Sequence, residues 1–342
     1  MKKFMKLLGT SLIGLMALTA CGTAPSTGDQ GSADKEKEEA SQEVESVVVG
    51  VTQYVEHPSL DAAYEGFKAA LKDNGFVEGE NLDLKYQSAQ GDQNNTHTIA
   101  TNLVGDNVDL IFANATPSAI AAQNATNDIP IVFTSVTDAV EAGLVEEMEK
   151  TDGNITGVVD LHPESIKKTM EFIDEYFNGA KVGVIYNAGE QNSVVQMKAV
   201  EEAAEGTSLQ LVTRTVATSA EVQQAANSLV GTADVFFVFT DNTVVSALDS
   251  VISVVNDHQI PLVVGEPDSL AKGGFATFGI DYYTIGYRTG EMAAQILKGE
   301  KTIADLPVEY PQEMQLFINK TAAEAQGIEW NAKWDEIAEI VE

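Results

Sequence analysis

Short apolar runs alternate with helical patterns from Val47 to the end of the chain, and this alternation is the feature that most limits the possible folds. The runs are "VVVGV" (47–51), "LDLKY" (82–86), "VDLIFA" (108–113), "IPIVFT" (129–134) and "NITGVVD" (154–160), then "KVGVIYN" (181–187), "LQLVTRTV" (209–216), "ADVFFVFT" (233–240), "IPLVVGE" (260–266) and "FATFGID" (275–281). Strands that alternate with helices predict βαβ units and parallel sheets. "VFFVF" is apolar on both faces, as a strand covered by helices on both sides requires. We therefore predict an α/β fold with doubly wound parallel sheets.

The two series of runs share one rhythm, which indicates two similar lobes joined by a hinge. Each series has a strand that ends in Phe-Thr, at 133–134 and 239–240, followed by a polar cluster with an Asp. The length of the chain beyond Ser46 also favours two cores over one. We expect the following division: residues 47–160 and 282–308 in lobe 1, and residues 161–281 and 309–342 in lobe 2.

The N-terminal segment carries the pattern of an export signal. Lysines at 2, 3 and 6 precede the apolar run "LLGTSLIGLMA", which is too short to span a bilayer as a stable helix. The run ends in "LTAC", which resembles a bacterial lipobox with Cys21 as the lipidated residue; an ordinary signal peptide with a chance cysteine is the alternative. We predict a lipoprotein signal peptide at 1–20. Residues 21–46 are polar and should form a flexible tether.

Composition and motifs exclude several classes of function. The chain has 20 Lys and Arg against 52 Asp and Glu, a formal net charge of −32, so nucleic acid is a poor partner. Cys21 is the only cysteine, which excludes a disulfide within the chain and a structural cysteine–zinc site. No G-x-S-x-G, H-E-x-x-H or Walker motif occurs, and the four histidines lack metal-binding spacing. We expect neither an enzyme nor a bound metal or cofactor.

Polar side chains gather where the predicted strands end, and ligands of open parallel sheets bind beyond those carboxyl ends. The candidate ligand-binding residues are Gln53, Tyr54, Asn114, Thr116, Pro117, Ser118, Ser135, Thr137, Asp138, Asn187, Asn192, Ser193, Asp241, Asn242, Glu266, Asp281 and Tyr282. Each Ser, Thr, Asn or Asp could instead only cap the helix that follows. However, "TSVTD" (134–138) and "TDNT" (240–243) each supply four polar groups, which is more than a cap needs.

The residue types suggest a site for a zwitterion. Hydroxyl groups and helix N-termini attract a carboxylate, and we expect Ser135 and Thr137 to face it. A carboxylate in a cleft needs a positive partner, which an ammonium would supply. We expect that ammonium to meet a residue of lobe 2, Asp241 or Asp281, rather than Asp138. These features predict an α-amino acid as the ligand.

Several longer strings then resemble one known family. They include "QYVEHPSLDAAYEGF" (53–67), "TDNTVVSAL" (240–248) and "GIDYYTIGYRTGEMAAQILKGE" (279–300). These strings are similar to ABC-transporter substrate-binding lipoproteins of the tryptophan/tyrosine type, over roughly residues 47 to 328. The resemblance implies a type I periplasmic-binding-protein fold with three crossovers between the lobes. By position, "NATPS" and "TSVTD" would hold the ligand carboxylate, "TDN" and "GIDY" the ammonium, and Tyr54 would line the side-chain pocket.

The resemblance also implies a biological role. It predicts capture of an aromatic amino acid, tryptophan first, for an ABC permease and its ATPase. The protein would be a monomer held on the outer face of the bacterial membrane by lipid at Cys21. Two alternatives remain at this stage: the same clamp could present its closed form to a membrane receptor as a sensor, or it could bind another small ligand, such as a different amino acid or a nucleoside.

Overall fold

The computed structural model describes residues 46–151, 153–311 and 314–342. The described residues form one compact unit. The predicted signal peptide, Cys21 and the predicted tether up to residue 45 lie outside the described residues, so those predictions remain untested. No helix of the described ranges has the length and apolar character needed to cross a membrane.

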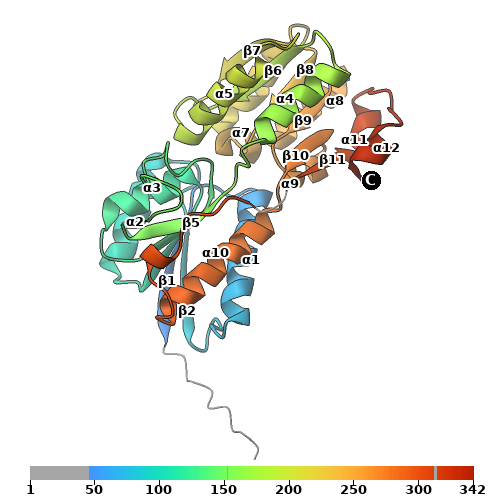
Figure 1. The fold of residues 1–342 in the computed structure, drawn as a ribbon. Coiled ribbons are helices and arrows are strands. Elements are labelled where there is room, and N and C mark those ends of the chain that lie inside the picture. Colours follow the sequence, from blue (N-terminus) through green and yellow to red (C-terminus); the bar gives the residue numbers. More distant parts are fainter. Residues whose placement is uncertain (1–45, 152, 312–313) are drawn as a thin grey trace, which may run out of the picture. The chain divides into compact units, whose positions relative to one another are not determined.

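The first lobe is built on a five-stranded parallel sheet in the order β2-β1-β3-β4-β5. The strands are β1 (Val47–Gln53), β2 (Leu82–Ser88), β3 (Leu110–Asn114), β4 (Ile131–Val136) and β5 (Ile155–Val159). Helices α1 (Pro58–Asp73) and α10 (Tyr282–Leu297) cover one face of the sheet, and α2 (Gln93–Gly105) and α3 (Thr116–Ala125) cover the other (Figure 1).

The second lobe contains a seven-stranded sheet in the order β12-β11-β10-β9-β8-β6-β7, in which only the β10–β11 pair is antiparallel. Its strands are β6 (Lys181–Tyr186), β7 (Gln210–Thr215), β8 (Val235–Val238), β9 (Leu262–Val264), β10 (Ala276–Gly279), β11 (Gln315–Asn319) and β12 (Glu339–Val341). Helices α4 (Ser165–Tyr176) and α5 (Gln191–Ala204) pack on one face, and α6 (Val222–Leu229) and α8 (Leu248–His258) pack on the other. Short helices α7 (Asn242–Ser246), α9 (Pro267–Lys272), α11 (Lys320–Ala325) and α12 (Trp334–Ile337) complete the lobe.

The predicted fold class is confirmed, since each of the ten apolar runs contains a strand of one of two α/β sheets. After β8 the chain forms two helices, α7 and α8, because the backbone leaves helical geometry at Ala247, with φ −114° and ψ 20°. Strand β12 was not predicted. Its three residues pair with β11 at the edge of the sheet, and no apolar run or turn signal in the sequence predicts this pairing.

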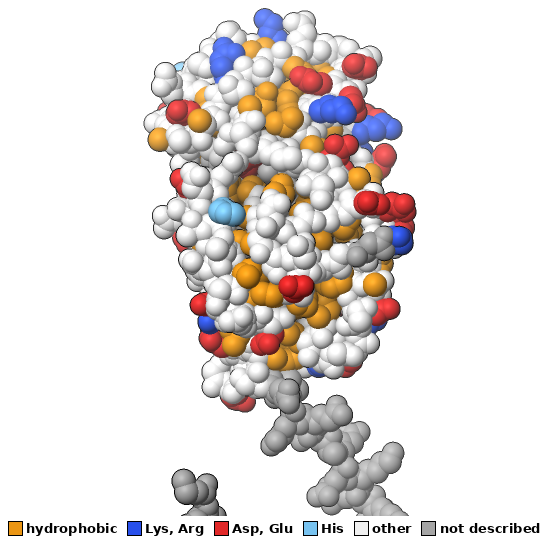
Figure 2. Space-filling model, turned by 90° about the vertical axis from the view of Figure 1, so that its left-hand side faces the viewer, with side chains coloured by type: hydrophobic (Ala, Val, Ile, Leu, Met, Phe, Trp, Pro, Cys, Tyr) orange, Lys and Arg blue, Asp and Glu red, His pale blue; other side chains and the backbone are white. Residues whose placement is uncertain are grey.

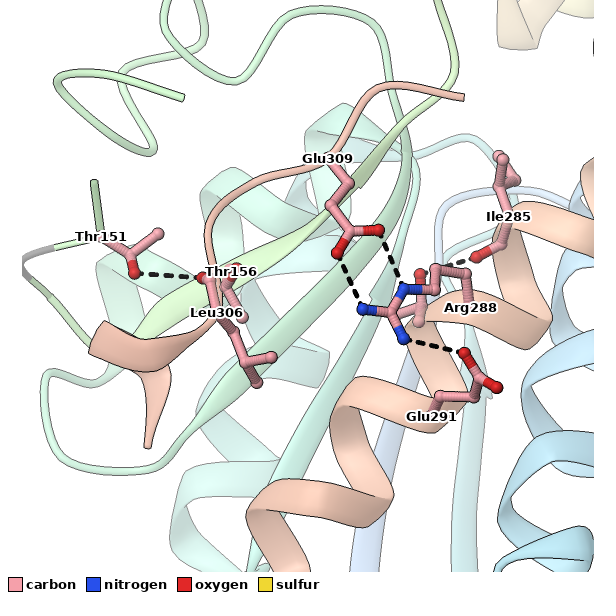
Figure 3. A network of polar contacts seen from close by, with 8 residues as sticks. Thr151, Thr156, Ile285, Arg288, Glu291, Leu306 and Glu309 are labelled. Carbon is pink, nitrogen blue, oxygen red and sulfur yellow. Dashed lines mark hydrogen bonds and ion pairs between the residues drawn. The ribbon is translucent and has the colours of Figure 1, made fainter. Parts of the chain in front are cut away.

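The segment after α10 is fastened to the first lobe by the polar contacts drawn in Figure 3. The hydroxyls of Thr151 and Thr156 both donate to the carbonyl oxygen of Leu306, at 3.2 and 2.7 Å. Glu309 pairs with Val158 beside β5. The Arg288 guanidinium donates two hydrogen bonds of 2.8 Å to the Glu309 carboxylate, a bidentate ion pair. The chain therefore stays with the first lobe through Glu309.

Helices α1 and α10 approach each other backbone to backbone. A Cβ atom added to Gly286 would lie 1.9 Å from the carbonyl oxygen of Ala63, and one added to Gly66 would lie 2.1 Å from the carbonyl oxygen of Tyr283. Only glycine fits at such contacts. This close packing matters for function because the N-terminal turns of both helices supply residues to the cavity described below.

Replacing Gly286 with Ala should lower the free energy of unfolding by about 2 kcal/mol or more, because two backbones must separate to admit the methyl group. Urea unfolding followed by circular dichroism measures this. The matched control is Gly105→Ala at the end of α2, where no atom lies within 4 Å of the added Cβ. Equal stability of the two variants would contradict the packing argument.

Candidate ligand-binding site

A small cavity lies between the two lobes, at the carboxyl ends of their strands. The first lobe and the crossover beside it contribute His57, Ser59, Leu60, Ser135, Thr137, Asp160 and Tyr282, and the second lobe contributes Asn192, Thr240, Asn242, Val245 and Glu266. These residues lie at or just after the ends of strands β1, β4, β5, β6, β8, β9 and β10, or begin the helices that follow these strands. The position is the one that open parallel sheets reserve for ligands.

The first turn of α1 forms one wall of the cavity. His57 is the N-cap of this helix, and its Nδ1 atom accepts a hydrogen bond from the Leu60 N–H at 3.5 Å. Burial lowers the pKa of His57 to about 4, so the ring is neutral at physiological pH. The hydroxyl of Ser59 is also buried and has no hydrogen-bond partner among the described residues.

The end of β4 forms a second wall and is irregular. Ser135 has a φ of 57°, a left-handed conformation that is uncommon outside glycine, and the pairing with β5 shifts register between Phe133 and Val136. Such bulges re-aim side chains and recur beside functional sites. The Ser135 hydroxyl is buried in the wall of the cavity, where no described residue pairs with it.

Two buried carboxylates face the cavity, and no Lys or Arg of the described ranges lines it. Asp160 accepts a hydrogen bond from the Tyr282 hydroxyl at 2.6 Å through Oδ2, while its Oδ1 has no partner in those ranges. Burial raises the pKa of Asp160 to about 6, against the opposing effect of the Tyr282 hydrogen bond. Glu266 caps α9 through the backbone N–H and the hydroxyl of Ser269, and burial raises its pKa to about 7.

Four polar atoms that line this cavity are buried and lack a hydrogen-bond partner within the described part of the chain. They are the hydroxyls of Ser59 and Ser135, Oδ1 of Asp160 and Oδ1 of Asn192. Most buried polar atoms in proteins are paired, because an unpaired one loses its interactions with water and gains nothing in return. Their concentration around one cavity indicates a site for a polar ligand. In the described ranges, no group of three or more His, Cys, Asp or Glu side chains is arranged to hold a metal ion.

Six of the predicted site residues line the cavity, namely Ser135, Thr137, Asn192, Asn242, Glu266 and Tyr282. A further group is buried behind the walls: Gln53, Asn114, Thr116, Ser118, Asn187, Ser193 and Asp241. The Asn114 amide, for example, donates to the Gln53 side chain at 3.1 Å and to the Leu60 carbonyl oxygen at 2.8 Å, which ties the first turn of α1 to β3. Asp241 accepts from the backbone N–H groups of Asn187 and Val244.

The structure places the other predicted residues away from the cavity. Asp138 caps the turn that follows it by accepting from the N–H groups of Val140 and Glu141, both at 2.9 Å. Asp281 is exposed and caps α10 through the Thr284 N–H. Neither Asp281 nor Asp241 lines the cavity, so the predicted ammonium partners are not where a ligand in this cavity would lie. Pro117 and Tyr54 line two neighbouring grooves instead.

The groove that contains Pro117 opens between α2, α3 and the start of α5 and is lined by His97, Ile120 and Ala121 among others. A hollow with apolar side chains inside is visible half-way up the face in Figure 2. Across this groove, the Gln93 amide donates to the Gly189 carbonyl oxygen at 2.8 Å, a direct hydrogen bond between the lobes.

The sequence analysis missed Asp160, the cavity carboxylate that keeps one oxygen without a partner in the described residues. Asp160 directly follows an apolar strand, which is the pattern that selected the other site residues. We placed this residue at the boundary between the lobes and did not include it in the predicted site. His57, Ser59, Leu60, Thr240 and Val245 were also absent from the predicted site. Leu60 and Val245 carry no polar signal at all.

Two doubly wound lobes that enclose a polar cavity at their strand ends define a solute-binding protein. The chain belongs to the ABC transporter substrate-binding protein family, whose sequence model matches residues 48–339. Members of this family bind solutes for ABC transporters and are not enzymes.

Similar proteins cover most of the chain. A tyrosine-binding protein of Clostridioides difficile (strain R20291) is 41% identical over 325 residues, which cover 95% of this chain and 92% of the relative. The crystal structure of a Streptococcus pneumonia ABC domain in complex with L-Trp has 30% identity and a TM-score of 0.81, and covers 86% of this chain and 100% of its own. A conserved domain protein from Vibrio cholerae has 38% identity and a TM-score of 0.83, with 87% and 100% covered.

A fourth comparison bears on the arrangement of the lobes. The ligand-free, open structure of a Clostridium difficile substrate-binding protein with adhesive properties is 41% identical and covers 86% of this chain and 99% of its own, yet its TM-score is 0.63. The L-Trp complex is less similar in sequence but more similar in structure. Sequence identity and structural similarity thus rank these two proteins in opposite order. This is expected when the lobes of our chain are closed around the cavity, as hinged binding proteins close around ligand.

The protonation of Asp160 should appear in the pH dependence of stability. Its pKa in the folded protein, about 6, lies above the ordinary value of 3.8, so the folded state holds this proton more tightly than the unfolded state. Ligand-free protein should therefore lose stability relative to Asp160→Asn as pH rises from about 4 to 6, by about 3 kcal/mol at most.

Urea unfolding of both proteins between pH 4 and pH 8, without ligand, tests this expectation. Asp83→Asn on β2 is a control with the same substitution at an exposed position. A stability difference between the parent and Asp160→Asn that stays constant with pH would show that Asp160 is not buried as an uncompensated acid.

Proposed function

We propose that this protein captures an α-amino acid with an aromatic side chain, tryptophan or tyrosine, and delivers it to an ABC importer. The observation that carries the proposal is the buried Asp160 carboxylate. One of its oxygens has no partner among the described residues, and no described Lys or Arg lines the closed cavity that it faces. Such a group calls for a cationic ligand, and an ammonium supplies both charge and hydrogen-bond donors.

The ammonium would lie between Asp160 and Glu266, which come from the crossover next to lobe 1 and from lobe 2. Binding there pairs charges on both sides of the cleft, and so favours the closed arrangement over the open one. Hydroxyls of Ser59, Ser135 and Thr137 and the N-terminal turn of α1 also line the cavity, and such donors suit the carboxylate of the ligand.

The size and shape of the ligand side chain are suggested by relatives. One relative is named for tyrosine binding, and a structural neighbour was solved with L-Trp. In this chain, Leu60, Val245 and the rings of His57 and Tyr282 give the cavity its apolar surface. These residues support an aromatic or other largely apolar side chain.

Thermal-shift measurements with the twenty amino acids and with simple nucleosides test the proposal. We expect tryptophan or tyrosine to give the largest shift, since a ligand at 100 times its dissociation constant adds about 2.7 kcal/mol of stability. Asp160→Asn should weaken binding by about 2–5 kcal/mol. Affinity of the parent protein should fall as pH drops below about 6, the pKa of ligand-free Asp160, because protonation removes the charge that the ammonium pairs with.

A nucleoside that binds while no amino acid does would contradict the proposed ligand class. Unchanged affinity in Asp160→Asn would contradict the proposed ammonium site while leaving the amino acid itself possible. Asp281→Asn serves as the control carboxylate, since its side chain is exposed and caps α10 outside the cavity.

We further propose that the mature protein works as an extracytoplasmic monomer anchored by lipid at Cys21. The lipobox-like "LTAC" and the polar segment after it support this placement, as does membership of a family that serves ABC transporters. A lipid and a tether would keep the binding lobes near a permease.

Cys21→Ala should release the protein from the membrane fraction into the soluble extracellular fraction, because the lipid would have no attachment site. Fractionation followed by immunoblotting measures the distribution. Continued sedimentation of Cys21→Ala with membranes would contradict the anchor, and a Thr19→Ala variant controls for changes within the signal that spare the cysteine.

A further inference from the structure

Glu190 is a fully buried carboxylate that lies next to the cavity without lining it. Its Oε2 accepts a hydrogen bond from the Asn242 amide nitrogen at 2.7 Å. Its Oε1 accepts from the backbone N–H and the hydroxyl of Thr243, at 3.1 and 2.6 Å. Every one of these partners is a donor, so both oxygens of the Glu190 side chain act as acceptors.

This arrangement fixes which way the Asn242 amide points. An amide side chain has a donor end and an acceptor end, and the two ends are not interchangeable beside a carboxylate. If the amide were rotated by half a turn, its carbonyl oxygen would meet Glu190 Oε2, and two acceptors would repel at hydrogen-bonding distance. The NH₂ group therefore faces Glu190, and the Asn242 carbonyl oxygen is left for the cavity that this residue lines.

A donor from the other lobe lines the same cavity. His57 is neutral, and its Nδ1 accepts from the Leu60 N–H, so the ring proton is on Nε2. The Asn242 side chain lies close enough to the His57 ring to act against the lowering of the His57 pKa by burial. The Asn242 NH₂ thus donates to Glu190, and the Asn242 oxygen is an acceptor that the His57 Nε2–H donor suits.

We infer that Glu190 is a positioning residue for ligand recognition: it orients Asn242 so that a hydrogen-bond acceptor faces the cleft. That acceptor selects ligands that present an N–H or O–H donor, such as an ammonium or the ring N–H of an indole, and it links lobe 2 to His57 on closure. The inference deepens the proposed function and rests on it for the identity of the ligand.

Glu190→Gln tests the orientation directly. The two Thr243 donors would retain the oxygen of the substituted side chain, so its new NH₂ group would face Asn242. The Asn242 amide would then turn its oxygen toward that NH₂ group and its own NH₂ toward the cavity, where it would oppose the donors of His57 and of the ligand. We expect about 10- to 100-fold weaker binding of the amino acid that binds the parent best, measured by calorimetry.

A reciprocal exchange should restore the acceptor. In the double variant Glu190→Gln with Asn242→Asp, the new carboxylate accepts from the new amide and still presents an oxygen to the cavity, with the total charge unchanged. Binding should return to within a few-fold of the parent. Asn242→Asp alone would set two carboxylates against each other, and weak binding is expected. Glu201→Gln, on the exposed side of helix α5, whose N-cap is Glu190, is the control for loss of a negative charge and should bind like the parent.

The ligand-free protein gives a second readout that does not depend on the proposed function. Long-range ¹H–¹⁵N spectra should show His57 protonated at Nε2 in the parent and in the double variant. In Glu190→Gln, the Nε2–H loses its acceptor, and the ¹⁵N shifts of the ring should change. Unchanged His57 shifts and unchanged affinity in folded Glu190→Gln would overturn the inference. If no amino acid bound the parent while these shifts changed as expected, the proposed ligand would fail but the positioning role of Glu190 would stand.

Discussion

The site depends on carboxylates that are buried without a positively charged partner from the described residues. Asp160 and Glu266 face one closed cavity, and the described residues around them supply hydroxyls, amides and a neutral imidazole but no Lys or Arg. Removing carboxylates from water without a cation is unfavourable, and it raises the pKa of both groups to about 6 and about 7. A cationic ligand removes this cost only when both sides of the cleft surround it. Relief of this desolvation cost therefore contributes to ligand affinity. It also couples ligand binding to closure of the lobes, because the relief is complete only in the closed arrangement.

The surrounding fold fixes the positions of the cavity walls through close backbone packing, an ion pair and buried hydrogen bonds. Helices α1 and α10 pack with glycine against backbone, so that their first turns, which carry His57, Ser59 and Tyr282, cannot shift independently. The bidentate Arg288–Glu309 pair keeps the returning chain on the first lobe. In the second lobe, Glu190 and Asp241 arrange the loop ends by accepting from backbone N–H groups and from the side chains of Asn187, Asn242 and Thr243. These buried carboxylates act as acceptors that organise the wall, in contrast to Asp160, whose second oxygen is available to a ligand.

Local sequence patterns predicted some site residues well and others not at all. The polar end of β4 led to Ser135 and Thr137, and the one after β8 led to Asn242, because a strand end with more polar groups than a cap needs is informative. The same rule selected Asp138 and Asp281, which turned out to cap the backbone that follows them. A cap and a ligand contact use the same residue types, and only the direction of the side chain separates them. Asp160 shows the opposite error, since its importance arises from an oxygen left without a described partner, which no sequence pattern reveals.

The sequence by itself determined the class of this protein. Apolar runs spaced by helical segments specify two parallel α/β sheets, and the family resemblance rests on strings that can be read without coordinates. Periodicity suffices for this because burial of strands and helix faces is a property of neighbouring residues. Tertiary structure decided which carboxylate keeps an oxygen for a ligand, which way the Asn242 amide points and where the two lobes share a cavity. Those outcomes depend on contacts between residues far apart in the chain, such as His57 with Asn242 and Asp160 with Tyr282, and on how deeply each is removed from water.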